Sequence, residues 1–280
     1  MTQNLVTLDF KDEKALLELT RAILYTQYGL EYYDLPKENL IPRVPQRVAY
    51  LDWIKQLFDT VEKEIISESM EEENVDESRQ LIGFDIGTGA NLIYPILGIL
   101  KYNMQFAGSD INPDSIHWAT TEILNKNKKL QQNFIGQIRL QKDYESVLEG
   151  VISVNEIDEK FDFTMCNPPF FNHEEERTFR HQSVCPITKS EDSTIGGEIR
   201  FLCEYAQESL KFKNQVKWFT SLIGKKTTYE FIKNYIVNML KFDSGEEEYD
   251  ILIASGEIEE GQTKRWLIGW RFIKLNQLKY

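Results

Sequence analysis

Long apolar segments are absent from the sequence. No run of eighteen apolar residues occurs, and the first twenty positions already hold six charged side chains. A membrane-spanning helix needs about 20 predominantly apolar residues, and a secretory signal needs an apolar stretch behind a basic start. We therefore expect neither a membrane span nor a signal peptide, and an intracellular protein without a membrane partner.

Cysteine is also scarce. The three cysteines, Cys166, Cys185 and Cys203, are odd in number and include no CxxC pair. This pattern argues against a disulfide framework and against a zinc site. We expect reduced thiols and no metal.

Basic residues are outnumbered, with 32 Lys and Arg against 45 Asp and Glu and a formal charge of −13. Contacts to phosphate supply most of the non-specific affinity for nucleic acid. A nucleic-acid surface would therefore have to be a local basic patch.

The order of patterns predicts a helical N-terminal part followed by an α/β domain. Helical spacing covers 9–29 and 47–66, the three prolines of 35–47 predict an ordered loop without regular structure, and 67–79 is acidic enough to be a solvated linker. From residue 81, strands alternate with helices, as in a parallel doubly wound sheet. Strands are expected at 81–86, 104–109, 137–142, 161–166, 216–222, 249–255 and 266–273, and helices at 90–101, 113–128, 197–212 and 227–240. The last two strands would form a hairpin joined by Gly256 to Gly261. The predicted division is 1–66, 67–79 and 80–280.

The first predicted strand ends in a DxGxG turn, which includes Asp85, Gly87, Thr88 and Gly89. Glycines there permit a tight turn and close approach of a ligand. Leu92 stands where a dinucleotide fingerprint has its third glycine, which argues against an NAD site. No GK[ST] follows, which argues against the phosphate-binding loop of an ATP site. Asp110 follows about twenty residues later, where a carboxylate typically bonds a ribose.

The fourth predicted strand ends in Asn167-Pro168-Pro169-Phe170. The prolines would stop the strand and stiffen the backbone, the amide can donate and accept hydrogen bonds, and the phenylalanine offers a stacking face. Alone, this stretch could be a strand end with core aromatics. After the glycine turn and Asp110, the order resembles that of class I S-adenosylmethionine-dependent methyltransferases, and this resemblance implies a pocket that methylates a planar amino or amide nitrogen. Cys166 is expected to be a packed thiol and not a nucleophile.

Several runs together resemble the methyltransferase-like 16 family and the related bacterial large-subunit rRNA adenine methyltransferases. They are GLEYYDLPKENLIPRVPQR, FDIGTGANLIYPILG, MCNPPFFN, GGEIRFLCEYAQESL, WFTSLIGKK and TKRWLIGW. The resemblance implies a Rossmann-like class I methyltransferase fold, with a mainly parallel seven-stranded sheet, a C-terminal antiparallel hairpin and an N-terminal helical subdomain. It implies S-adenosylmethionine as cofactor and adenine N6 in a structured RNA as acceptor, with U6 small nuclear RNA as one example.

Residue roles carry over from this resemblance. Asn167, Pro168, Pro169 and Phe170 would hold the target adenine, which must be unpaired or flipped. The residues expected to bind the cofactor are Arg47, Asp85, Gly87, Thr88, Gly89, Asp110, Asp143 and Asn167, with Arg47 on the methionine carboxylate and Asp110 on the ribose. The residues expected to contact RNA are Arg177, Arg180, Lys225, Lys226 and Arg265.

The loop 172–199 is shorter and more acidic than in the family. A protein partner could therefore supply the basic surface that RNA binding needs. Without such a partner we expect a monomer. We do not expect DNA as a substrate. The expected compartment is the nucleus, the cytoplasm or both. Two alternatives stay open: a catalytically weak cofactor-binding or RNA-binding assembly or splicing factor, and a protein glutamine methyltransferase.

Overall fold

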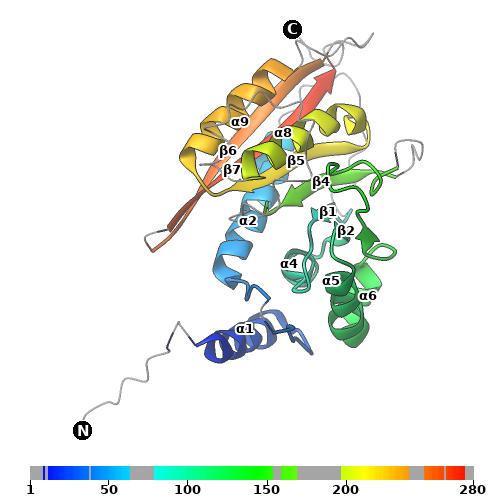
Figure 1. Ribbon diagram of the computed structural model, residues 1–280, viewed down its shortest axis with the longest axis vertical. Helices are drawn as coiled ribbons and strands as arrows, with labels where there is room; N and C mark the ends of the chain where they lie inside the picture. Colours follow the sequence, from blue (N-terminus) through cyan, green and yellow to red (C-terminus); the bar gives the residue numbers. More distant parts are fainter. Residues whose placement is uncertain are drawn as a thin grey trace.

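The computed structural model describes residue 9 and residues 12–37, 39–63, 79–153, 159–168, 197–239, 249–261 and 263–274. Seven strands form one sheet in the order β3-β2-β1-β4-β5-β7-β6 (Figure 1). They are β1 (Ile82–Ile86), β2 (Gln105–Asp110), β3 (Arg139–Leu140), β4 (Phe161–Cys166), β5 (Val216–Ile223), β6 (Tyr249–Glu260) and β7 (Thr263–Lys274). The first five strands pair in parallel, and β7 pairs antiparallel with β5 and β6. The predicted fold class is confirmed.

The helices also follow the predicted order, except that α6 was not predicted. They are α1 (Glu13–Tyr28), α2 (Val44–Gln56), α4 (Ile93–Tyr102), α5 (Pro113–Trp118), α6 (Lys128–Asn133), α8 (Gly197–Ser209) and α9 (Lys226–Met239). Short π or 3₁₀ turns extend three of them: η1 (Leu57–Glu62) after α2, η2 (Ala119–Ile123) and η3 (Leu124–Lys126) after α5, and η5 (Leu210–Phe212) after α8. None of the described helices is long and apolar enough to cross a membrane.

The prediction that 35–47 lacks regular structure is wrong at its end, because α2 already begins at Val44. Pro45 falls in the first turn of this helix, where its missing N–H is not needed. Arg47 therefore projects from a rigid helical turn and not from a loop.

Two apolar clusters cover the two faces of the sheet. One contains residues of α1, α2 and α4 together with Phe163 and Trp218 of the sheet. The other contains residues of α8 and α9, which lie over β5–β7 in Figure 1. The N-terminal helices therefore share a core with the strands. The division at 67–79 stays a prediction, because most of that segment lies outside the described residues.

The hairpin differs from its prediction. Its turn does not begin at Gly256, since β6 continues through this residue to Glu260. A Cβ at Gly256 would lie 2.6 Å from Nε1 of Trp53, and one at Gly269 would lie 3.1 Å from the same ring. Gly256 is thus a place where α2 packs closely on the hairpin, and not a turn residue.

Candidate active site

The order of the strands reverses beside β1, with β2 on one side and β4 on the other. Ligands of open α/β sheets bind outside the carboxyl ends of the strands at such a point. In the parallel register, Ile86 pairs with Ser109 of β2 and with Cys166 of β4. The residues that follow these strand ends, including Gly87, Asp110 and Asn167, are therefore brought to one edge.

The glycine turn after β1 has the tight geometry expected from its sequence. Gly87 and Gly89 have φ angles of 74° and 60°, which glycine adopts readily. The N–H groups of Gly87 and Thr88 both donate to the carbonyl of Ser109 at 2.9 Å. A Cβ at Gly108 would lie 2.5 Å from Cγ2 of Thr88, so the turn packs directly on β2.

Leu92, at the place of the missing third glycine, takes a left-handed conformation with φ of 50° just before α4. Such a conformation costs a non-glycine residue about 1 kcal/mol or more. Leu92 is fully buried, and Asn91 Oδ1 accepts the N–H of Ile93 at 3.0 Å. Packing and this bond hold the turn in place.

Asp110 is hydrogen-bonded to the glycine turn. Its Oδ2 accepts the N–H of Gly89 at 2.7 Å, and its Oδ1 accepts the N–H of Asn112 at 2.8 Å. Burial raises the pKa of Asp110, and the backbone N–H donors oppose that rise. Each carboxylate oxygen has a further lone pair, so the geometry leaves acceptors for ribose hydroxyls.

Asp85 and Arg47 are buried charges with unmet hydrogen bonding. Asp85 is 1% exposed, and neither of its carboxylate oxygens has a partner among the described residues. Burial raises its pKa well above the usual 3.8, the charge of Asp110 adds to that rise, and Arg47 opposes it. Arg47 donates from Nη1 to the hydroxyl of Tyr94, while its Nε has no partner within the described part of the chain.

Asn167 follows β4 and is half-buried, yet its Oδ1 is buried and has no hydrogen-bond partner among the described residues. Pro168 is buried beside it. Pro169 and Phe170 lie outside the described residues, and so do Arg177 and Arg180. Their predicted roles stay predictions.

A buried polar network behind Asn167 was missed by the sequence analysis. Thr220 Oγ1 donates to the carbonyl of Thr164 at 2.9 Å, so the Tyr50 hydroxyl, 2.8 Å from Thr220 Oγ1, must be the donor of that second bond. The hydroxyl of Tyr205 bonds Thr164 Oγ1. These bonds tie β4, two residues before Cys166, to α2, β5 and α8. The sequence feature that could have indicated this network is a threonine inside each of two largely apolar strands, Thr164 in β4 and Thr220 in β5.

Cys166 is fully buried, and its Sγ donates to Ser221 Oγ at 3.2 Å. Burial raises the pKa of the thiol. The thiolate is the nucleophilic form, so this environment suits the packed thiol that was predicted.

Asp143 lies in an exposed turn after β3. Its oxygens accept the N–H of Glu145 at 2.9 Å and the hydroxyl of Ser146 at 3.0 Å. Gln141 donates its N–H to the carbonyl of Asp110 at 2.9 Å, which keeps the start of this turn beside the site. A contact of Asp143 with the cofactor stays a prediction.

The predicted basic residues that the structure describes lie at the end of β5. Ile223 pairs with Trp266, which places Lys225 and Lys226 near Arg265 of β7. Arg265 Nη1 reaches the carbonyl of Gly224 at 3.5 Å. Because β5 is parallel to β4, this cluster shares the edge on which Asn167 lies. Lys226 is 3.8 Å from Glu230.

Glu198, in the first turn of α8, anchors this cluster. It is 4% exposed, and its Oε1 accepts the N–H of Gly224 at 2.7 Å. Burial raises its pKa, and the charges of Lys225 and Arg265 are among the influences that lower it. The GGE sequence at the start of α8 includes this residue, but no sequence pattern indicated that it would bond Gly224.

The buried polar atoms fit the cofactor that the resemblance implies. The atoms without hydrogen-bond partners in the described part of the chain include Arg47 Nε, Asp85 Oδ1 and Oδ2, Thr88 Oγ1 and Asn167 Oδ1. A guanidinium suits a carboxylate, a carboxylate suits an ammonium, and the remaining oxygens accept hydrogen bonds. Orphaned polar groups are rare in native proteins and call for a ligand or water.

Residues 2–274 match a family described as RNA methyltransferase. Ribosomal RNA large subunit methyltransferase F of Bacteroides thetaiotaomicron is 35% identical over 96% of this chain and 87% of that protein. U6 small nuclear RNA (adenine-(43)-N(6))-methyltransferase of Schizosaccharomyces pombe is 33% identical over 95% of this chain and 62% of that protein.

Solved structures agree. The N-terminal domain of human METTL16 in complex with SAH is 27% identical, with a TM-score of 0.71 over 98% of this chain and 88% of that one. The hMettl16 catalytic domain in complex with MAT2A 3'UTR hairpin 6 is 26% identical, with a TM-score of 0.68 over 100% of this chain and 89% of that one.

Proposed function

The chain belongs to the RNA methyltransferase family, and from that premise we propose that it transfers a methyl group from S-adenosylmethionine to N6 of an adenine in structured RNA. One observation carries the choice of acceptor: the buried Oδ1 of Asn167, just after β4 and beside the glycine turn, has no hydrogen-bond partner among the described residues. A carboxamide oxygen in that place can accept a hydrogen bond from a planar amino group. The relatives named for rRNA and for U6 RNA support RNA as the carrier of that group.

Each side of the cofactor would meet a matching group of this chain. Arg47 would pair with the methionine carboxylate, and Asp85 with the ammonium group. Asp110 would accept from the ribose hydroxyls, and the turn of Gly87, Thr88 and Gly89 would allow the backbone to approach closely. When bound, S-adenosylmethionine supplies an electrophilic methyl group.

The acceptor half of the site would make the adenine amino group a better nucleophile. The lone pair of the amino nitrogen is delocalised into the ring. If the two N–H groups donate hydrogen bonds to Asn167 Oδ1 and to the Pro168 carbonyl, these bonds would draw the nitrogen out of conjugation and orient it. Phe170 would stack on the base, a contact worth about 1–3 kcal/mol. Orientation and exclusion of water supply most of the rate in a direct displacement. The nitrogen releases its spare proton to solvent.

RNA would approach along the basic edge formed by Lys225, Lys226 and Arg265. Arg177 and Arg180 stay predicted RNA contacts. Against a formal charge of −13, this local patch would make the phosphate contacts that binding needs. The same charge favours a second candidate, a cofactor-binding RNA assembly factor with weak catalysis. The compartment follows from the substrate, since U6 RNA would mean the nucleus and bacterial rRNA the cytoplasm.

The test is transfer of a labelled methyl group to large-subunit rRNA, to U6 RNA and to total protein, followed by nucleoside analysis. We expect N6-methyladenosine in RNA, reduced about a hundredfold or more in Asn167→Ala. Asn238→Ala, at an exposed position of α9 where the amide donates to the Asn234 carbonyl at 2.7 Å, is the matched control and should keep full activity. Label in protein would indicate a protein methyltransferase. Cofactor binding without label in either fraction would favour the assembly factor.

A further inference from the structure

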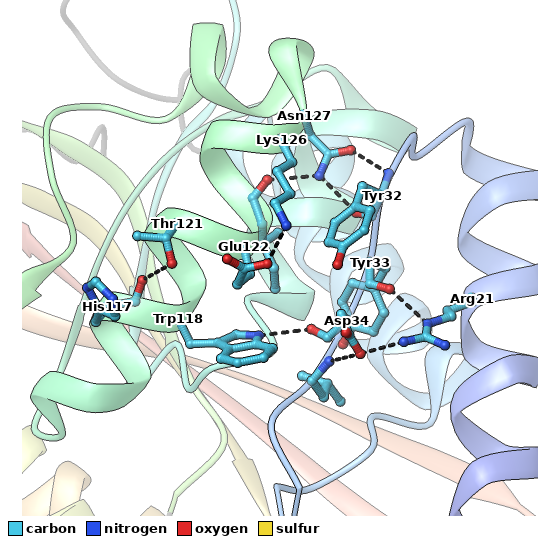
Figure 2. Close-up of polar contacts among 12 residues, drawn as sticks. Arg21, Tyr32, Tyr33, Asp34, His117, Trp118, Thr121, Glu122, Lys126 and Asn127 are labelled. Carbon is cyan, nitrogen blue, oxygen red and sulfur yellow. Dashed lines mark hydrogen bonds and ion pairs between the residues drawn. The ribbon is translucent and has the colours of Figure 1, made fainter.

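The segment that joins α1 to α2 is held along the side of the helical run α5–η3 (Figure 2). We call residues 30–36 the connecting segment. It has no regular secondary structure, so its position depends on contacts made by other elements. Trp118 and Asn127 beside the helical run and Arg21 of α1 make hydrogen bonds to it.

Asn127, at the end of η3, holds the first part of the connecting segment. Its Oδ1 accepts the N–H groups of Glu31 and Tyr32, each at 3.0 Å and more than ninety positions away in sequence. Its Nδ2 donates to the carbonyls of Tyr32 and Ile123, each at 2.8 Å. The side chain is 3% exposed. All four of its polar contacts are thus made to backbone, and three of them fix the connecting segment.

Asp34 marks the second point of attachment. Its carbonyl accepts the indole N–H of Trp118 at 3.1 Å, and its carboxylate forms an ion pair with Arg21 of α1 (Figure 2). The same carboxylate accepts the N–H of Leu35 at 2.8 Å, while Arg21 Nε donates to the carbonyl of Tyr33 at 2.8 Å. The segment is therefore bonded to a helix on each side.

These attachments link the two sides of the site. The helical run begins at α5, directly after Asn112, whose N–H is bonded to Asp110. The connecting segment leads on to α2, whose first turn carries Arg47. Asn127 and Trp118 thus join the helices that follow Asp110 to the segment that precedes α2 in sequence.

We propose that Asn127 and Trp118 are positioning residues for cofactor binding, which act by holding the connecting segment so that Arg47 is presented to the cofactor carboxylate. This inference rests on the proposed function. It assigns a role in cofactor binding to Trp118, at the end of α5, and to Asn127, just after η3.

The test is calorimetric binding of S-adenosylhomocysteine to purified variants. Asn127→Ala, which loses three hydrogen bonds to the connecting segment, should raise the dissociation constant about tenfold or more. Trp118→Phe keeps an aromatic side chain but loses the pyrrole ring of the indole with its N–H, and so the bond to the Asp34 carbonyl. It should raise the dissociation constant about threefold, and it keeps the proposal testable if Asn127→Ala does not fold. Asn133→Ala, in α6, removes bonds to Gln80 and Lys129 only, and should bind like the wild type.

Two readouts separate positioning from a general loss of stability. At saturating cofactor, Trp118→Phe should keep its turnover within about twofold, because only presentation of Arg47 is altered. In an Arg47→Ala background, Trp118→Phe should have no further effect on the dissociation constant, since residues that act through one another are not additive. Additive effects, or unchanged affinity in Trp118→Phe and Asn127→Ala, would overturn the proposal.

The same measurements distinguish this inference from the proposed function. If the wild type does not bind S-adenosylhomocysteine, the proposed function fails. If the wild type binds and Arg47→Ala weakens binding, but the two positioning variants behave like Asn133→Ala, only the inference fails.

Discussion

Arg47 donates a hydrogen bond from Nη1 to the hydroxyl of Tyr94 at 2.9 Å across 47 positions of sequence, and its guanidinium carbon lies 5.5 Å from the centre of that ring. The contact joins the first turn of α2 to the first turn of α4, which follows the glycine turn. It leaves Arg47 Nε without a partner in the described part of the chain. The guanidinium is therefore fixed in place before a ligand arrives.

Tyr94→Phe should raise the dissociation constant for S-adenosylhomocysteine by roughly threefold to tenfold, because one net hydrogen bond contributes about 0.5–1.5 kcal/mol to holding Arg47. Calorimetry measures the change. Tyr102→Phe, also in α4, loses a hydroxyl that bonds Asp52 on the surface and should bind normally. Equal affinity of Tyr94→Phe and the wild type would show that Arg47 needs no such support.

Asp85→Asn should stabilise the ligand-free protein at neutral pH and abolish tight cofactor binding. The folded-state pKa of Asp85 is raised. The stability that the protonated Asp85 side chain contributes is therefore fully present below the pKa of Asp in the unfolded chain, near 3.9. It is lost as pH rises through the pKa of Asp85 in the folded protein. Above that pKa a buried carboxylate remains that has no hydrogen-bond partner among the described residues. Its replacement by an amide should raise the free energy of unfolding by at least about 1 kcal/mol.

Thermal unfolding of wild type and Asp85→Asn between pH 5 and pH 9 measures this effect. The gap in melting temperature should widen as pH rises. It should shrink when cofactor is added to the wild type, because the proposed pairing with the cofactor ammonium would offset the cost of the buried carboxylate. A variant that is less stable than the wild type at every pH would contradict this account.

Cys166→Ala should keep methyl transfer within about threefold, because a buried thiol behaves as a small apolar side chain. Its stability should fall by about 1 kcal/mol through the lost packing and the lost contact with Ser221. Steady-state rates and chemical denaturation provide the two readouts. A hundredfold loss of turnover with unchanged cofactor affinity would instead give the thiol a role in the chemistry.

Lys225→Gln should weaken RNA binding and reduce the slope of log affinity against log salt by about one, as expected for the loss of one phosphate contact. The effect should be the same for different RNA sequences. Lys129→Gln, in α6, which packs against α4, is the charge-matched control and should leave the slope unchanged. An unchanged slope in Lys225→Gln would remove the end of β5 from the RNA surface.

Local patterns predicted the elements well, because strand and helix periodicity depends on neighbouring residues. The DxGxG turn required tight backbone, and the structure confirms it at Gly87 and Gly89. The prolines of 35–47 misled, because Pro45 is compatible with the start of a helix as well as with a loop. The prediction of a turn at Gly256 was wrong because a glycine inside a strand can also be required by close packing of a residue distant in sequence, here Trp53.

By itself, the sequence determined the order of the elements and the polar residues that end each strand, since parallel strands bring their carboxyl ends to one edge of a sheet. Only the tertiary structure decided which side chains meet across that edge and behind it. The pairs Arg47 with Tyr94, Tyr50 with Thr220 and Asn127 with Tyr32 are 47, 170 and 95 positions apart. Such contacts are set by how helices pack on the sheet, and no local pattern encodes them.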